Sequence, residues 1–153
     1  MRKSVSGVFV IAAILVAASS AGTYGQAMKE KPLYDRLGGK KSITAVVDEF
    51  VSRVAADARI NKFFAATAAD SQRLASFKMK LVDQICEASG GPCKYKGKDM
   101  KTAHMGMGVG GGDFDALVED LVGALDAFHV GAHEKDQLLG ALGPMTSDIV
   151  EKR

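Results

Sequence analysis

One segment of the chain reads Gly90-Gly91-Pro92-Cys93-Lys94-Tyr95-Lys96-Gly97-Lys98-Asp99-Met100-Lys101-Thr102-Ala103-His104. The two glycines and the proline at its start prevent any preceding helix from continuing. A short helix is expected to begin near Asp99 and to carry His104. A lone histidine in such a helix is more often a surface or packing residue than a ligand, because imidazole is intermediate in its preference for burial. The function of His104 therefore has to be judged from the rest of the chain.

The chain around this segment has the apolar spacing of helices, mostly three and four residues, with no sustained two-residue alternation. A short helix is predicted at 33–37, before Gly38-Gly39, and a longer one with Ser42 as its N-cap, ending near Ala56. Further helices are predicted over 74–88, over 114–128 with Asp113 as N-cap, and over 138–149 with a kink or restart at Pro144. The fold class predicted from this pattern is all-α.

The first 21 residues have the pattern of a secretory signal peptide. Arg2 and Lys3 precede an apolar run over 8–18 that is short for a membrane span, and small residues follow at 19–21. An uncleaved N-terminal anchor is the alternative. Cleavage after Ala21 would leave 132 residues with 18 basic and 18 acidic side chains, so no net charge would attract nucleic acid or an anionic membrane. The expected organisation is a signal peptide at 1–21, a flexible segment at 22–31 and one domain at 32–153, in an exported protein.

Cys86 and Cys93 are the only cysteines. An even count in an exported protein favours a disulfide, and two free thiols remain the alternative. There is no Cys-x-x-Cys-His motif, which excludes the covalent haem attachment of c-type cytochromes. A nucleophilic pair of Cys86 with His104 is disfavoured because Cys86 falls on an apolar helical face.

Taken together, the order and spacing of several motifs resemble a truncated haemoglobin of group I, over roughly Pro32 to Ile149. The matching pieces are Leu33-Tyr34-Asp35-Arg36-Leu37-Gly38-Gly39, the helix of Phe50, Arg59-Ile60-Asn61-Lys62-Phe63-Phe64, the segment from Gly90 to His104, and Phe114-Asp115-Ala116-Leu117-Val118-Glu119-Asp120-Leu121. The resemblance implies a globin-like two-over-two helical sandwich that binds haem b without a covalent bond.

The resemblance also implies roles for particular residues. His104 corresponds to the proximal histidine, the protein ligand to haem iron, which leaves the opposite face open for a gas. Phe64 corresponds to the aromatic residue against the porphyrin, and Lys80 and Tyr95 to positions that reach the propionates. The apolar slot would be lined by Phe50, Phe63, Met100, Ala103, Phe114 and Leu117. Without the histidine, these aromatic residues would be assigned to an ordinary core, Lys80 to a solvated face and Tyr95 to a loop.

On the gas-binding side the chain departs from the family pattern. Relatives commonly place tyrosine where this chain has Val51, and often glutamine on the next long helix, where the main positions are Phe77 and Leu81. A donor at such positions stabilises bound dioxygen by about 1–3 kcal/mol. The pocket is therefore expected to hold oxygen loosely and to bind carbon monoxide and nitric oxide readily. Lys80 as a sixth iron ligand is a second hypothesis.

The function predicted is reversible binding of a diatomic gas, as in oxygen transport or sensing, by a monomer. The alternative is a haem enzyme, a nitric oxide dioxygenase or peroxidase, that depends on an external reductase. The sequence encodes no reductase domain, which favours the binding protein. A helical interaction module without haem is the third class considered.

Overall fold

A computed structural model describes residues 30–152, which form ten helical segments. The predicted signal peptide at 1–21 and most of the segment at 22–31 lie outside these residues. In chain order the segments are α1 (Leu33–Arg36), α2 (Gly39–Ala56), the 3₁₀ turn η1 (Asn61–Phe63), α3 (Ala65–Ala68), α4 (Ser71–Ala88), α5 (Met100–His104), α6 (Gly111–Ala127), α7 (Ala132–Leu142), the 3₁₀ turn η2 (Gly143–Met145) and α8 (Thr146–Ile149). Among the described residues, no helix is long and apolar enough to cross a bilayer.

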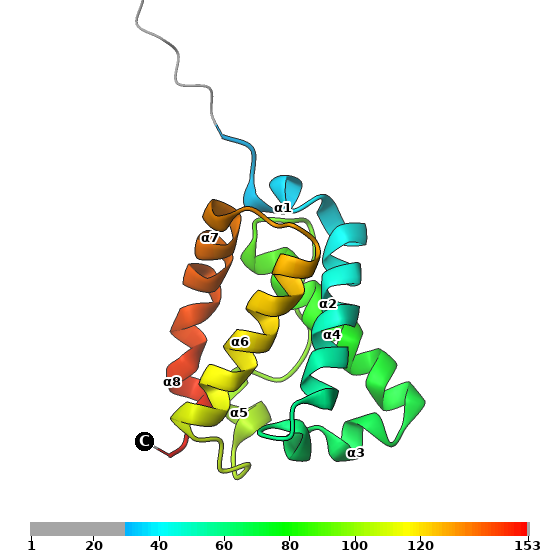
Figure 1. The fold of residues 1–153 in the computed structure, drawn as a ribbon, viewed down its shortest axis with the longest axis vertical. Helices are drawn as coiled ribbons and strands as arrows, with labels where there is room; N and C mark the ends of the chain where they lie inside the picture. Colours follow the sequence, from blue (N-terminus) through cyan, green and yellow to red (C-terminus); the bar gives the residue numbers. More distant parts are fainter. Residues whose placement is uncertain (1–29, 153) are drawn as a thin grey trace, which may run out of the picture.

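The long helices confirm the all-α prediction and its layered arrangement. Helix α2 packs against both α4 and α6, and α7 contacts α4 and α1. In Figure 1, α6 runs between α2 and the α7-to-α8 run, while the short α5 lies low in the view near α8. The core cluster takes side chains from every long helix and from Ile60, just before η1: Ile43, Val46, Val47, Phe50, Val54, Ile60, Val82, Ile85, Cys86, Ala116, Leu121, Ala124, Leu125 and Leu138.

Two predicted helix caps are wrong, for identifiable reasons. Helix α2 begins at Gly39 instead of after Ser42, because Gly38 adopts a left-handed φ of 87° and turns the chain earlier. The Tyr34 hydroxyl accepts a hydrogen bond from the Lys40 amide at 3.0 Å, which satisfies one of the free amides of the first turn. Helix α6 begins at Gly111, and Asp113 lies in its first turn, where its carboxylate accepts from the Gly110 amide at 2.9 Å.

The segments around α4 and at the C-terminal end differ in how well the sequence predicts them. Helix α3 was not predicted from the polar stretch before α4, although alanine supports this single turn. Pro144 restarts the last helix as expected, because it lies at the beginning of η2, after which α8 follows. Asp70 caps α4 by accepting from the Arg73 amide at 2.9 Å.

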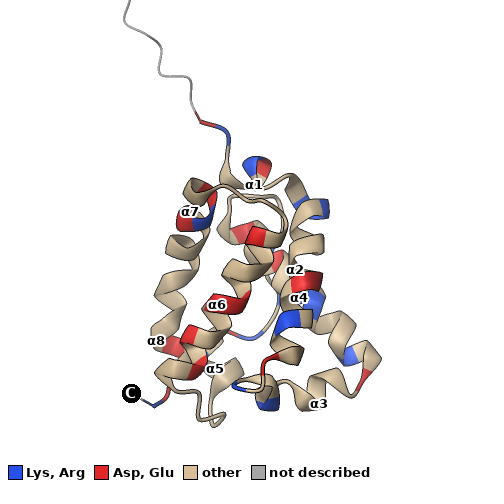
Figure 2. Ribbon diagram, in the orientation of Figure 1, with Lys and Arg blue, Asp and Glu red and all other residues tan. Residues whose placement is uncertain are grey.

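Charge is unevenly divided among the helices. Figure 2 shows only acidic positions along α6, whereas basic positions occur on α2 and α4. Partners from outside α6 offset its charge: Arg59 pairs with Glu119 at 2.8 Å, and Lys135 pairs with Asp126. Asp120 has a buried carboxylate oxygen with no hydrogen-bond partner, and its burial raises its pKa above the ordinary value.

Cys86 and Cys93 form a disulfide, with their Cα atoms 5.7 Å apart. Cys86 is fully buried near the end of α4, and Cys93 lies in the loop that leads to α5. The bridge therefore fastens the chain on both sides of the Gly90-Gly91-Pro92 break. The intervening Gly91 has no space for a side chain, since a Cβ there would lie 2.7 Å from the Cys86 sulfur.

Replacing both cysteines with serine is expected to lower the free energy of unfolding by about 2–3 kcal/mol, because a loop of this length gains that much chain entropy when the bridge is absent. Urea denaturation of the oxidised wild type and the double variant measures the difference. Reduction of the wild type should produce the same shift. Equal midpoints for all three would show that the bridge contributes no stability.

Candidate functional site

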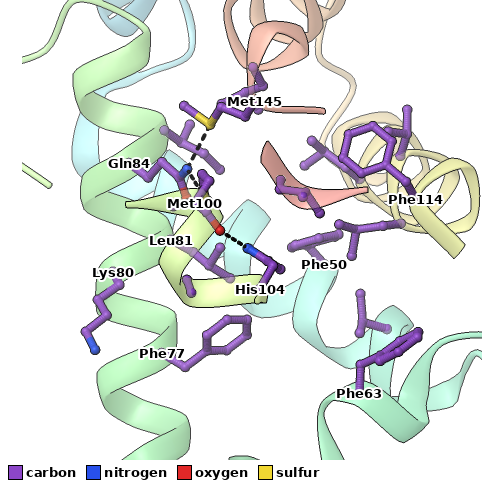
Figure 3. Close-up of a pocket in the computed structure, with 18 of the residues that line it drawn as sticks. Phe50, Phe63, Phe77, Lys80, Leu81, Gln84, Met100, His104, Phe114 and Met145 are labelled. Carbon is purple, nitrogen blue, oxygen red and sulfur yellow. Dashed lines mark hydrogen bonds between the residues drawn. The ribbon is translucent and has the colours of Figure 1, made fainter. Parts of the chain in front are cut away.

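Helix α5 carries His104. Its N-cap Asp99 accepts a hydrogen bond from the Thr102 amide at 2.9 Å, which closes the first turn. The helix is only five residues long, and His104 is its last residue. His104 is partly buried. Figure 3 shows the ring directed inward, close to Phe77 and Phe50 in that view.

One hydrogen bond fixes the chemical state of this imidazole. The Nδ1 atom of His104 lies 2.7 Å from the carbonyl oxygen of Met100, one turn earlier (Figure 3). A carbonyl only accepts, so Nδ1 carries the proton and donates it. In the neutral ring Nε2 is then unprotonated, and its lone pair is free to bind a metal. This arrangement of a backbone partner on one ring nitrogen is the one that orients metal-binding histidines in proteins.

A cavity of about 500 Å³ opens beside His104, between the long helices. The structure brings all thirteen sequence-predicted site residues to its walls: Phe50, Val51, Phe63, Phe64, Phe77, Lys80, Leu81, Tyr95, Met100, Ala103, His104, Phe114 and Leu117. These residues come from five helical segments, the turn at Phe64 and the loop that carries Tyr95, so their meeting is a property of the fold. Their roles toward a cofactor remain predictions.

Sequence reasoning missed a second set of lining residues. Most are apolar: Val54, Ile85, Met107, Val118, Leu121, Leu139, Leu142, Met145 and Ile149. For Leu139, Leu142, Met145 and Ile149, the helical spacing of the C-terminal apolar residues is a signal that could have found them. Thr67, Gln84, Lys98 and Gly143 also reach the wall.

Polar groups gather at one part of the cavity, around the loop between α4 and α5. Lys80 is exposed, and its ammonium end points away from His104 in Figure 3. The Tyr95 hydroxyl donates to the Lys98 carbonyl at 2.9 Å, which folds the loop over itself. Glu87 accepts from the Tyr95 amide at 2.9 Å and pairs with Lys94 at 3.0 Å. These contacts lower the pKa of Glu87, the amide of Tyr95 contributing most.

Several hydrogen-bonded carboxylates are expected to lower the stability of the folded chain at acid pH. Their pKa values are lowered mainly by hydrogen bonds that they accept, in Asp57, Asp70, Glu87, Asp99 and Glu134. Because each pKa is lower in the folded than in the unfolded chain, these groups stabilise the fold fully above the unfolded pKa, which is about 4. It is lost as the pH falls through the folded value.

Urea denaturation is therefore expected to give a free energy of unfolding that is level near neutral pH and falls between about pH 5 and pH 2. Glu87→Gln should make this fall shallower, since one of the contributing groups no longer titrates. Asp115→Asn, an exposed aspartate on α6, serves as the control. A stability that rose on acidification would contradict this account.

Three apolar side chains from α2 and α4 lie side by side on the cavity wall. Val51 on α2 and Phe77 and Leu81 on α4 are partly buried there, and the rings of Phe64 and Phe77 pack with centroids 5.7 Å apart at 48°. Gln84 lies one helical turn beyond Leu81 on α4. Its side-chain amide donates to the Met145 sulfur at 3.0 Å and to the Met100 sulfur at 3.5 Å (Figure 3). The amide hydrogens of Gln84 are thus directed at sulfur.

A second cavity of about 570 Å³ adjoins the first, between α2, η1, α3 and α4. Five residues line both cavities and so form the wall between them: Val51, Val54, Phe64, Thr67 and Phe77. Lys78 and Asp48 also line the second cavity and are joined by an ion pair of 2.8 Å. The aromatic pair therefore separates the space beside His104 from this neighbouring space.

The first cavity fits a large, flat and apolar cofactor that carries its own metal. Its lining supplies aromatic and aliphatic surface, one imidazole with a free nitrogen, and cationic side chains from the loop side that suit acidic substituents. His104 is the histidine on its wall, and its imidazole would be the side chain to hold such a metal. The other two histidines, His129 and His133, are exposed, so they contribute nothing to this site in the described part of the chain.

Comparison with known proteins places this geometry among the globins. Residues 32–151 match the family of bacterial-like globins. The group 1 truncated haemoglobin of Mycolicibacterium paratuberculosis is 36% identical over 117 residues, covering 76% of this chain and 82% of the relative. That of Tetrahymena thermophila is 33% identical over 112 residues, covering 73% and 85%.

Solved structures of truncated haemoglobins have the same fold as this chain. Truncated haemoglobin from Tetrahymena pyriformis in its Fe(III) form superposes with a TM-score of 0.70 at 29% identity, covering 78% of this chain and 98% of that one. The 2/2 haemoglobin of a Synechococcus species, in the cyanomet state and with covalently attached haem, gives a TM-score of 0.71 at 30% identity, covering 79% and 99%. The two-over-two arrangement predicted from the motifs is thus confirmed.

Proposed function

Because this chain belongs to the bacterial-like globin family, as a group 1 truncated haemoglobin, we propose that it binds haem b in the cavity beside His104 and reversibly binds a diatomic gas there. The observation that carries the proposal is the state of His104: its Nδ1 donates to the Met100 carbonyl, and its Nε2 is free beside a cavity of about 500 Å³. Haem supplies an iron centre that binds a gas on the face opposite its protein ligand.

The chain's own residues perform three tasks in this function. His104 holds the iron. Phe63, Phe64 and Phe114 provide apolar surface that excludes water from the cofactor. Lys80 and Lys98 offer ammonium groups to the propionates, and Lys80 pointing away from His104 supports this role over that of a sixth ligand.

The ligand side of the pocket sets the preference among gases. Val51, Phe77 and Leu81 contribute no hydrogen-bond donor, and the amide hydrogens of Gln84 are directed at methionine sulfurs. Such a pocket stabilises carbon monoxide and nitric oxide, whose binding depends little on a donor, more than oxygen. The pocket therefore favours a gas carrier or sensor over an enzyme that must retain oxygen for a second reactant.

A second proposal concerns location. The signal-peptide pattern of residues 1–21 favours export, and the disulfide between Cys86 and Cys93 is consistent with an oxidising compartment, where such bridges persist. Sequencing the N-terminus of protein recovered from the medium or periplasm tests it. A mature chain that begins near residue 22 is expected, and an intact Met1 in cytosolic protein would contradict it.

Absorption spectroscopy tests the haem proposal directly. The purified protein mixed with ferric haem should bind one equivalent and develop a Soret band. Reduction and carbon monoxide should then give the spectrum of a histidine-ligated carbonyl complex. A protein that leaves free haem unchanged would refute the function, and the helical interaction module would become the preferred alternative. Oxygen dissociation that proved very slow would instead refute the apolar pocket.

A further inference from the structure

The C-terminal residues form a clamp on the loop that follows His104. This loop, residues 105–110, is joined to residues 151–152 by backbone hydrogen bonds: the amides of Glu151 and Lys152 donate to the Val109 carbonyl at 2.9 and 3.1 Å, and the Gly111 amide donates to the Lys152 carbonyl at 3.2 Å. Gly110 and Lys152 form a parallel bridge. Val109 and Ile149 are buried beneath these contacts.

The Glu151 side chain adds a second set of bonds to the same loop. One carboxylate oxygen accepts from the Gly106 amide at 2.6 Å, and the other accepts from the Gly108 amide at 2.5 Å. Both glycines have left-handed backbone conformations, with φ of 80° and 69°, that other residues rarely adopt. The loop therefore takes a shape that turns two amides toward a single anion, two and four residues beyond His104.

The connection from this carboxylate to the imidazole is short. The Met107 amide donates to the His104 carbonyl at 3.0 Å, so the loop is bonded to the histidine's own backbone. Helix α5 is a single turn, and its contacts with α8 belong to its main tertiary contacts. A helix this short has little rigidity of its own. Its orientation therefore depends on the loop, which the Glu151 carboxylate holds at two amides in addition to the backbone bonds.

Resting on the haem-binding function proposed above, we propose that Glu151 is a positioning residue for the iron ligand: its carboxylate fixes the loop at residues 105–110 and thereby the orientation of the His104 ring. Glutamine at this position is a strict test, because it preserves size while replacing one acceptor oxygen with an amide group that cannot accept from a backbone amide. One of the two glycine amides then loses its partner.

The measurement compares haem-loaded wild type, Glu151→Gln and Asp148→Asn. The last variant removes an exposed carboxylate from α8 in the same terminal segment and is the matched control. In Glu151→Gln we expect the iron–histidine stretching band of the ferrous protein to shift or broaden in resonance Raman spectra. We expect haem transfer to apomyoglobin to become about tenfold faster, as the loss of one charge-assisted hydrogen bond predicts. Hydrogen exchange at Gly106 and Gly108 should also accelerate. Asp148→Asn should match the wild type in all three.

The outcomes separate this proposal from the haem function. An unchanged iron–histidine band and haem-transfer rate, together with faster exchange in Glu151→Gln, would show that the clamp is only structural and would overturn the proposal. A wild type without a Soret band would contradict both proposals. Glu151→Asp, whose shorter side chain keeps the charge, guards against poor folding of the glutamine variant, and it too should shift the band if positioning is the role of the carboxylate.

Discussion

His104→Gly is expected to remove the iron–histidine band and to increase the rate of haem loss by more than about tenfold. Mutating only the hydrogen-bond partner of a metal-binding side chain costs about 10- to 100-fold in metal affinity, so removal of the ligand itself should cost more. No other histidine can take over, because the remaining two, His129 and His133, are exposed and do not line the cavity. Resonance Raman spectra and haem transfer to apomyoglobin provide the measurements.

Addition of imidazole to His104→Gly should restore the spectrum, since the substitution leaves a space of the size of the missing ring. The matched control is His129→Gly, at an exposed residue whose φ of 54° suits glycine better than histidine. This control should keep the spectrum of the wild type. Retention of the iron–histidine band in His104→Gly would show that another residue binds the iron and would overturn the assignment.

A donor introduced at Val51 is expected to slow oxygen dissociation by about ten- to a hundredfold. Val51 lines the cavity from α2, so tyrosine there would add a hydroxyl donor beside Phe77 and Leu81, which have none. A hydrogen bond to a ligand that carries negative charge is worth about 1.5–3 kcal/mol, which gives the range of rates. Stopped-flow measurement of oxygen dissociation from the ferrous protein provides the test.

Val51→Phe is the control for this prediction, because it adds the same ring without the hydroxyl. Both variants overfill the pocket at a similar cost in stability, about 1–3 kcal/mol, so their comparison isolates the hydrogen bond. Carbon monoxide dissociation should differ little between them. Equal oxygen dissociation from the two variants would show that the hydroxyl does not reach the ligand.

The sequence was sufficient for most of the fold because its apolar spacing is regular. The apolar residues of α2, α4 and α6 recur every three or four positions. The glycine pair Gly38-Gly39 precedes α2, and Gly90-Gly91 follows α4. The predicted site residues converge on one cavity because the order of motifs, matched to a family, carries spatial information that a single motif does not. His104 illustrates this, since its own helix gave no reason to prefer a ligand over a packing residue.

The features that could not be predicted depend on contacts between distant parts of the chain. The Tyr34 hydroxyl bonds the first turn of α2, so Ser42 is not needed as its cap. Glu151 reaches an amide 45 residues earlier, and no local pattern marks an exposed glutamate near a terminus as structural. The amide of Gln84 is directed at two methionine sulfurs by packing between three helices. In each case a side chain is placed by tertiary structure rather than by its neighbours in sequence.

The cavity beside His104 also has a consequence for how this protein is made. The cavity of about 500 Å³ is open to solvent on one side, so its aromatic and aliphatic walls are an unfinished part of the hydrophobic core. Burying apolar surface contributes about 25 cal/mol per Å² to the free energy of folding. A bound haem would therefore complete this core and shift the folding equilibrium toward the compact state. Supply of haem would then govern how much of the protein survives proteolysis in the cell.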